Sequence, residues 1–122
     1  MPMKVRAIRG AVQVDSDSPE LISAATKELL LEILRVNEVV PDDVISVILT
    51  ATPDLTSAFP AAAAREIGFE RVPLMCAVEI DVKGALPRVI RAMATVNTER
   101  SQSEISHIYL GGAASLRRDI AQ

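Results

Sequence analysis

The sequence contains few cysteines and few aromatic residues. Its 122 residues include one cysteine, one tyrosine, two phenylalanines and no tryptophan. A single cysteine cannot form a disulfide within the chain, so the sequence does not suggest an oxidising compartment. Domains that bind nucleic acid usually combine a basic surface with stacking aromatic side chains, whereas this chain carries a net charge of −3. These scarcities argue against a nucleic-acid partner.

The sequence shows neither a basic and apolar leader nor an apolar run long enough to cross a bilayer. We therefore expect a cytoplasmic protein with no membrane partner. Apolar residues make up 49% of the chain, which suffices for one core in a single domain spanning residues 1–122. Small domains with spare apolar surface often bury it in a homo-oligomer, so self-association is expected.

The first half of the chain shows clear strand and helix patterns. Residues Met3–Val14 are rich in Val, Ile and Ala, which predicts a strand. A helix is predicted over Ser18–Asn37, because a serine N-cap and a proline precede apolar residues at three- and four-residue steps. The uncharged run Val44–Thr52 predicts a strand buried on both faces. A short helix is predicted over Pro60–Ile67.

The second half predicts two more strands and a second long helix. The run Pro73–Val82 is predicted as a strand and Gly84–Thr98 as a helix, because the latter has apolar residues at helical steps. A fourth strand is predicted over Ile105–Leu110, followed by a Gly-Gly hinge and a short tail helix. This order of elements predicts an α+β fold, in which a mixed β-sheet packs on helices.

Four polar side chains interrupt these apolar segments: Arg9, Glu79, Arg91 and Tyr109. Together they could bind a small polyanion. The residues alone leave two other interpretations open, because Glu79 and Arg91 could face solvent, or Glu79 could form a structural ion pair with Arg9. The sole cysteine and the sole histidine, His107, suit structural roles, so we expect no metal and no cofactor.

Several segments together resemble the small monofunctional chorismate mutases of the trimeric α/β-barrel class. The matching segments are "IRGA" (Ile8–Ala11), "ATPDLTSAFPAAAARE" (Ala51–Glu66), "VPLMCAVEIDVKGALPRVIRAM" (Val72–Met93) and "HIYLGGAASLR" (His107–Arg117). With the intervening helix they cover nearly the whole chain, and their combination is specific where any one piece is not. The resemblance implies a homotrimer that forms a pseudo-α/β-barrel, with each active site between two subunits.

The resemblance also assigns a role to each matching residue. Arg9 and Tyr109 would bind the side-chain carboxylate of chorismate, and Arg91 would contact its ether oxygen. Glu79 and Cys76 would hold the ring hydroxyl. The remaining contacts are Phe59 as an apolar wall, Arg65 and Arg117 at the mouth, backbone of Leu74, Met75 and Ala77, and the side chain of Leu116.

Two positions depart from the family pattern. Ala62 stands where the family often has a lysine, and Arg118 stands where a proline is common. Both positions belong to the rim of the implied site, so they bear on substrate affinity more than on the reaction.

The implied reaction suits these residues. Chorismate rearranges to prephenate within one molecule, so neither a nucleophile nor a metal is required. The protein would restrict the substrate to a compact conformation and place an arginine where negative charge develops on the ether oxygen. A trimeric enamine/imine deaminase and a non-catalytic module that binds an aromatic-pathway acid are the alternative functions.

Overall fold

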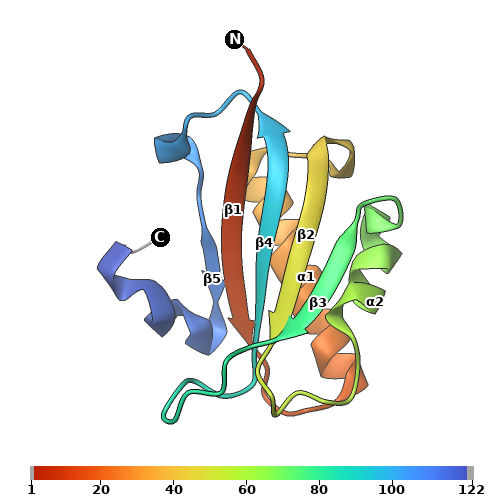
Figure 1. Ribbon diagram of the computed structural model, residues 1–122, viewed down its shortest axis with the longest axis vertical. Helices are drawn as coiled ribbons and strands as arrows, with labels where there is room; N and C mark the ends of the chain where they lie inside the picture. The colour runs from red at the N-terminus through yellow and green to blue at the C-terminus, as the bar shows by residue number, and fades with distance from the viewer. Residues whose placement is uncertain (1, 121–122) are drawn as a thin grey trace.

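The computed structural model describes residues 2–120, and it describes side chains as far as Leu116. The described residues form one five-stranded sheet with the strand order β3-β2-β4-β1-β5 (Figure 1). The strands are β1 (Lys4–Gln13), β2 (Val44–Ala51), β3 (Leu74–Val78), β4 (Val89–Thr98) and β5 (Ile108–Leu110). The sheet is mixed, because β4 runs antiparallel to β1 and β2 while β3 and β5 pair in parallel with β2 and β1.

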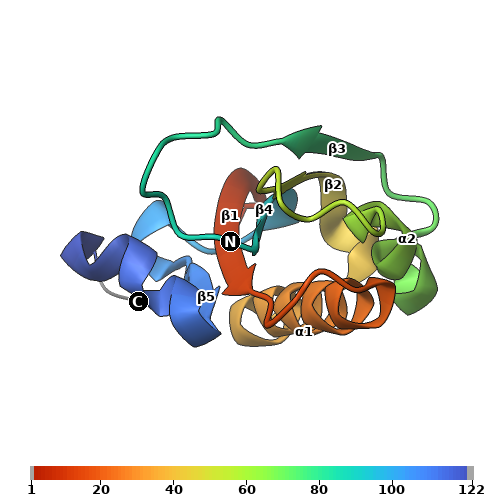
Figure 2. The ribbon, with the colours of Figure 1, turned by 90° about the horizontal axis from the view of Figure 1, so that it is seen from below.

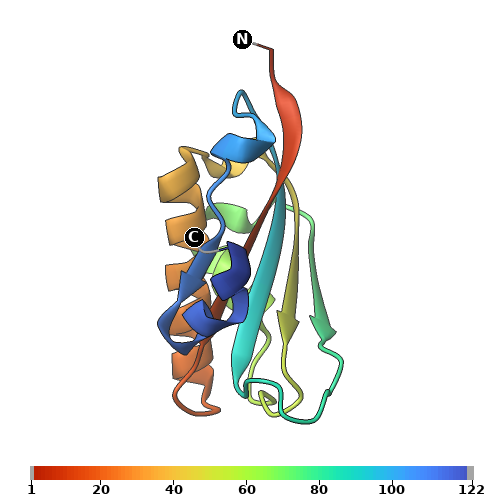
Figure 3. The ribbon, with the colours of Figure 1, turned by 90° about the vertical axis from the view of Figure 1, so that its left-hand side faces the viewer.

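The helices lie mainly on one face of this sheet. They are α1 (Pro19–Asn37), α2 (Pro60–Ala64) and the short or irregular turns η1 (Pro41–Asp43), η2 (Arg65–Phe69), η3 (Gln102–Glu104) and η4 (Gly111–Ile120). Seen edge-on, α1 covers one side of the strands while the opposite side stays open along β2, β3 and β4 (Figure 3). The predicted α+β class, with a mixed sheet backed by helices, is therefore confirmed.

The helix α1 begins and ends as its sequence predicts. The side chain of Ser18 accepts a hydrogen bond from the backbone N–H of Leu21 at 3.1 Å, and a proline occupies the first turn. At the other end, the buried Asn37 side chain donates to the carbonyl of Ser106 and accepts from its N–H. This pair of bonds fixes the end of α1 to the segment that leads into β5.

The core lies between α1 and the sheet. Ile8 and Val12 of β1 pack there with Leu29, Leu30 and apolar residues of β2 and β4. Gly10 permits this close packing, because a Cβ atom at its position would lie 2.8 Å from the Ile108 carbonyl oxygen and 2.8 Å from a Leu29 methyl group. The glycine next to Arg9 thus allows α1 and β5 to approach β1.

The prediction of a second long helix is wrong. Residues 79–88 form a loop without a helix, and Val89–Thr98 is the central strand β4. The apolar residues of this segment fit helical steps, but the buried Ile90, Ala92 and Ala94 also alternate with more exposed neighbours, as in a strand. The strand forms because β1 and β2 supply hydrogen-bonding partners on both of its edges, and this tertiary pairing overrides the local pattern.

Smaller differences concern the other strands. The third strand ends at Val78, so Glu79 follows it instead of lying inside it, and β5 is shorter than predicted. The prediction that β2 is buried on both faces is wrong for the single chain, because Ile48 is 46% exposed on the open face. Figure 2 shows the sheet from below, with α1 on one side of the strands and the open face on the other.

Candidate active site

Three of the four polar residues predicted to act together share the open face of the sheet. Arg91 of β4 lies opposite Thr50 of β2 and Ala11 of β1, and Ala11 pairs in turn with Tyr109 of β5. Arg9 precedes Ala11 by two residues and points to the same face, because strand side chains alternate. The register of four strands therefore brings together residues that are up to 100 positions apart in the sequence.

These residues line a cleft of about 230 Å³. Its walls carry the guanidinium groups of Arg9 and Arg91 and the phenol of Tyr109, while Ile48 and Met93 supply apolar surface. Such a cleft suits a small ligand that has an apolar body and more than one carboxylate, because arginine forks bind carboxylates in pairs of hydrogen bonds.

The fourth polar residue, Glu79, contacts Arg91 at the side of the cleft. Its backbone N–H donates to the carbonyl of Ala51 at 2.9 Å, which places its side chain beside β2. Its carboxylate oxygen Oε2 accepts from Arg91 Nε at 2.9 Å and from the Thr50 hydroxyl at 2.7 Å. The carboxylate is 15% exposed, and the Arg91 side chain is 41% exposed. Both the solvent-facing interpretation of Glu79 and its ion pair with Arg9 are therefore wrong, since its partner is Arg91.

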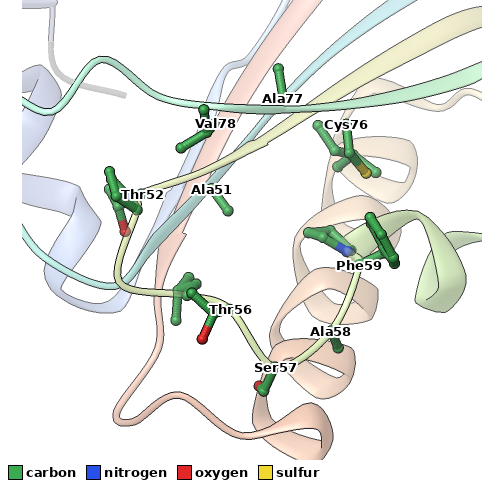
Figure 4. Close-up of a pocket in the computed structure, with 13 residues that line it drawn as sticks. Ala51, Thr52, Thr56, Ser57, Ala58, Phe59, Cys76, Ala77 and Val78 are labelled. Carbon is green, nitrogen blue, oxygen red and sulfur yellow. The ribbon is translucent and has the colours of Figure 1, made fainter.

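A second group of predicted residues surrounds the edge strand β3 and the loop before α2. Phe59, Cys76 and Ala77 line a cavity of about 470 Å³ together with the loop that follows β2 (Figure 4). A neighbouring cavity of about 440 Å³ contains Phe59 and Cys76 again, with Arg65 and Leu74. Phe59 is 75% exposed although it is a large apolar residue. The exposed ring leaves Phe59 available for contact, and its role as the apolar wall of a site stays a prediction.

The two groups lie apart within one chain. The cleft with Arg91 shares no lining residue with either cavity at Phe59. The alternation of β3 contributes to this division, because Cys76 pairs with the buried Leu49, whereas Met75 pairs with Ile48 on the open face. The predicted site residues of a single chain therefore fall into two groups, which we call the two partial sites.

The start of the tail packs beside the cleft. Ala113 is fully buried with Ala11 and Val89, and Tyr109 and Leu116 pack against this small cluster. Leu116 and Tyr109 therefore contact the same small apolar cluster, and the role of Leu116 in the site stays a prediction. The predicted contact Arg117 and the neighbouring Arg118 lie outside the side chains that the structure describes.

The loop that carries Phe59 is fixed by Asp17, a residue that sequence reasoning missed. The Asp17 carboxylate accepts from the backbone N–H and the hydroxyl of both Thr56 and Ser57, at 2.7 to 3.2 Å. The hydrogen bond from the Ser57 hydroxyl is the main cause that holds the pKa of Asp17 below its usual value. The carboxylate therefore joins the loop before α1 to the loop before Phe59.

His107 also supports the site from outside it. Its Nδ1 accepts a hydrogen bond from the backbone N–H of Arg9 at 3.0 Å. This contact fixes β1 at Arg9, which agrees with the structural role expected of this histidine.

Sequence reasoning also missed Thr50, whose hydroxyl contacts Glu79. A signal was present, because Ser46, Ile48 and Thr50 alternate with the buried Val47 and Leu49 along β2. The prediction of a strand buried on both faces overlooks this polar side of β2.

Comparisons with known proteins show which family the chain belongs to. Residues 5–120 match the family model of chorismate mutase type I. The chain is 52% identical to chorismate mutase AroH of Thermus thermophilus, over 95% of this chain and 96% of that protein. It is 45% identical to chorismate mutase AroH of Bacillus subtilis, over 98% and 94% of the two chains. A solved chorismate mutase from Clostridium thermocellum superposes with a TM-score of 0.87 at 47% identity, covering 88% of this chain and 96% of that one.

The chain therefore belongs to the type I chorismate mutase family. It is a chorismate mutase, an isomerase of aromatic amino acid biosynthesis, and the resemblance stated from its sequence is confirmed.

Proposed function

We propose that the chain rearranges chorismate to prephenate at sites formed between the subunits of a homotrimer, without a cofactor. The observation that carries this proposal is the cleft in which Arg91, held by Glu79, faces the same space as Arg9 and Tyr109. In this arrangement Arg9 and Tyr109 bind the side-chain carboxylate, and Arg91 donates to the ether oxygen as its bond to carbon breaks. Glu79 accepts a hydrogen bond from the ring hydroxyl, whose proton stays on the substrate.

The rate enhancement follows from positioning and charge. The cleft restricts the flexible enolpyruvyl group over the ring, so that the reacting carbons meet in a compact geometry. The permanent positive charge of Arg91 stabilises the developing negative charge on the ether oxygen more than the neutral oxygen of the ground state. The rearrangement transfers no proton, so it requires no pair of groups arranged for acid–base transfer.

The division of the predicted residues supports a site between subunits. Phe59, Arg65, Cys76 and backbone of β3 would come from one subunit, and the cleft with Arg91 would come from the next. The open face also exposes apolar side chains that a partner would bury: Val5 (57%), Ile48 (46%), Met75 (65%) and Met93 (42%). An exposed apolar patch of this kind is typical of a protein interface.

The test is to mix the purified protein with chorismate and to follow the loss of its ultraviolet absorbance and the formation of prephenate. We expect conversion without added metal or cofactor, and a mass in solution of three chains. Release of ammonia from an amino-acid-derived enamine would favour a deaminase instead, and tight binding of prephenate without turnover would favour a binding module.

No helix among the described residues is long and apolar enough to span a membrane. The cytoplasmic location stays a prediction, which cell fractionation tests.

A further inference from the structure

The hydroxyl of Thr50 contacts the same Glu79 carboxylate that pairs with Arg91. Thr50 and Arg91 are direct cross-strand neighbours on β2 and β4, and both donate to the same oxygen, Oε2 of Glu79. A carboxylate can only accept, so the Thr50 hydroxyl is the donor at 2.7 Å. Thr50 therefore supplies a second fixed point for a carboxylate that would otherwise be held by the arginine side chain alone.

This geometry leaves two groups available to a ligand, namely Oε1 of Glu79 and the terminal nitrogens of Arg91. Among the described side chains, Glu79 Oε1 accepts no hydrogen bond and the terminal nitrogens of Arg91 donate none. An isolated arginine and carboxylate usually prefer a bidentate pair, in which two N–H groups meet two oxygens. That pairing would use Oε1 and a terminal nitrogen of Arg91.

We propose that Thr50 is a positioning residue, which prevents Glu79 and Arg91 from closing into a bidentate ion pair. By holding Oε2, the hydroxyl keeps Oε1 directed at the ring hydroxyl of the substrate and keeps the Arg91 fork directed at the ether oxygen. The proposal rests on the proposed function, because it concerns the readiness of the same two side chains for the rearrangement.

The experiment compares Thr50→Val, which removes the hydroxyl but keeps the branched shape, with Thr50→Ser, which keeps the donor. For Thr50→Val we expect kcat for chorismate to fall at least about tenfold, the equivalent of losing one hydrogen bond to a charged group. KM should change far less than kcat, because the interaction matters most in the transition state. Thr50→Ser should retain most of the parent kcat.

Thr95→Val is the matched control, since Thr95 lies on the same face of β4 in the register Ala7↔Thr95 and has no side-chain hydrogen bond among the described residues. Its kcat should stay near the parent value. Size-exclusion chromatography and thermal unfolding of all three variants show whether assembly or folding has changed.

A double-mutant cycle distinguishes positioning from general stability. If Thr50 acts through Glu79, adding Thr50→Val to Glu79→Ala should lower kcat no further, although each single change lowers it. Parent-like kcat in Thr50→Val, an equal loss in Thr50→Ser, or additive losses in the cycle would each overturn the proposal. A parent protein that does not convert chorismate would instead overturn the proposed function, so the two failures are distinguishable.

Discussion

The guanidinium of Arg91 donates a hydrogen bond to the described residues only through Nε. Its Nε is bound to Glu79, while its side chain remains 41% exposed toward the cleft that Arg9 and Tyr109 also line. A guanidinium that is anchored at one nitrogen is already oriented before a substrate arrives, and such preorganised charge stabilises a transition state at little further reorganisation cost.

Replacing Arg91 by alanine should therefore remove the main electrostatic contribution. We expect kcat to fall by about 10² to 10³, the usual effect of deleting one preorganised donor. Arg91→Lys should recover little of this loss, because a single ammonium cannot contact Glu79 and the ether oxygen as a fork does. Steady-state kinetics with chorismate measure both effects.

The matched control is Arg71→Ala, since Arg71 is an exposed arginine outside the cleft. It should leave kcat near the parent value. If Arg91→Ala rearranged chorismate at the parent rate, the electrostatic role of this arginine would be wrong.

At the scale of single residues, the sequence made Arg9, Glu79, Arg91 and Tyr109 visible because each interrupts an apolar segment. It did not reveal that Glu79 pairs with Arg91, because that contact depends on the register between β2 and β4 and on where β3 ends. It also gave no sign of Asp17, whose partners lie 39 and 40 positions away.

At the scale of elements, loops and strand ends carry the contacts that shape the second partial site. The segment before Phe59 has no regular structure, and Asp17 holds it through four N–H and O–H groups of Thr56 and Ser57. Asp54 has a similar function nearby, since it accepts from the backbone N–H of Arg88 at the start of β4. Carboxylates thus connect loops that the sheet alone would leave independent.

The Asp17 contacts should make stability depend on pH. The folded protein holds the pKa of Asp17 below its value in the unfolded chain, about 3.9. The resulting stabilisation is therefore present above that unfolded value and is lost as the pH falls through the lower folded pKa. We expect Asp17→Ala to lower the Tm at pH 7 and to raise KM by loosening the Phe59 loop. The difference in Tm from the parent should shrink as the pH falls below about 4.

Asp15→Ala is the control, because Asp15 is exposed in the same loop and accepts none of these hydrogen bonds. Thermal unfolding between pH 3 and pH 7 and chorismate kinetics supply the measurements. An equal loss of Tm at every pH would show that the carboxylate charge is not responsible.

The element that the sequence misassigned is also the one that carries Arg91. Helical and strand spacing both fit the apolar residues of 89–98, and only strand pairing on both sides decides between them. The prediction of Arg91 as a site residue does not depend on the predicted helix, because it rests on a polar side chain in an apolar segment and on the matching segment Val72–Met93.

At the scale of the whole molecule, the two partial sites predict a test of assembly. Chains with Arg91→Ala and chains with both Phe59→Ala and Arg65→Ala should each be nearly inactive. If each site combines the cleft of one subunit with the Phe59 side of the next, random mixing in equal amounts should restore about one quarter of the sites in a cyclic trimer.

The mixture is prepared by unfolding and refolding the two variants together, and its chorismate turnover is compared with that of each variant refolded alone. Trimer mass is checked in each sample. Activity of the mixture no greater than the mean of the two variants would place both halves of the site in the same subunit.

The sequence by itself determined the family, the first helix with its caps, and the residue types that contact the substrate in our proposal. These conclusions follow from local patterns and from matching segments, which do not depend on contacts with distant parts of the chain. Only the tertiary structure decided that residues 89–98 form a strand, that Glu79 pairs with Arg91 and Thr50, and that the site residues divide into two groups. Those outcomes depend on strand register and on hydrogen bonds between segments distant in the sequence, which no local pattern encodes.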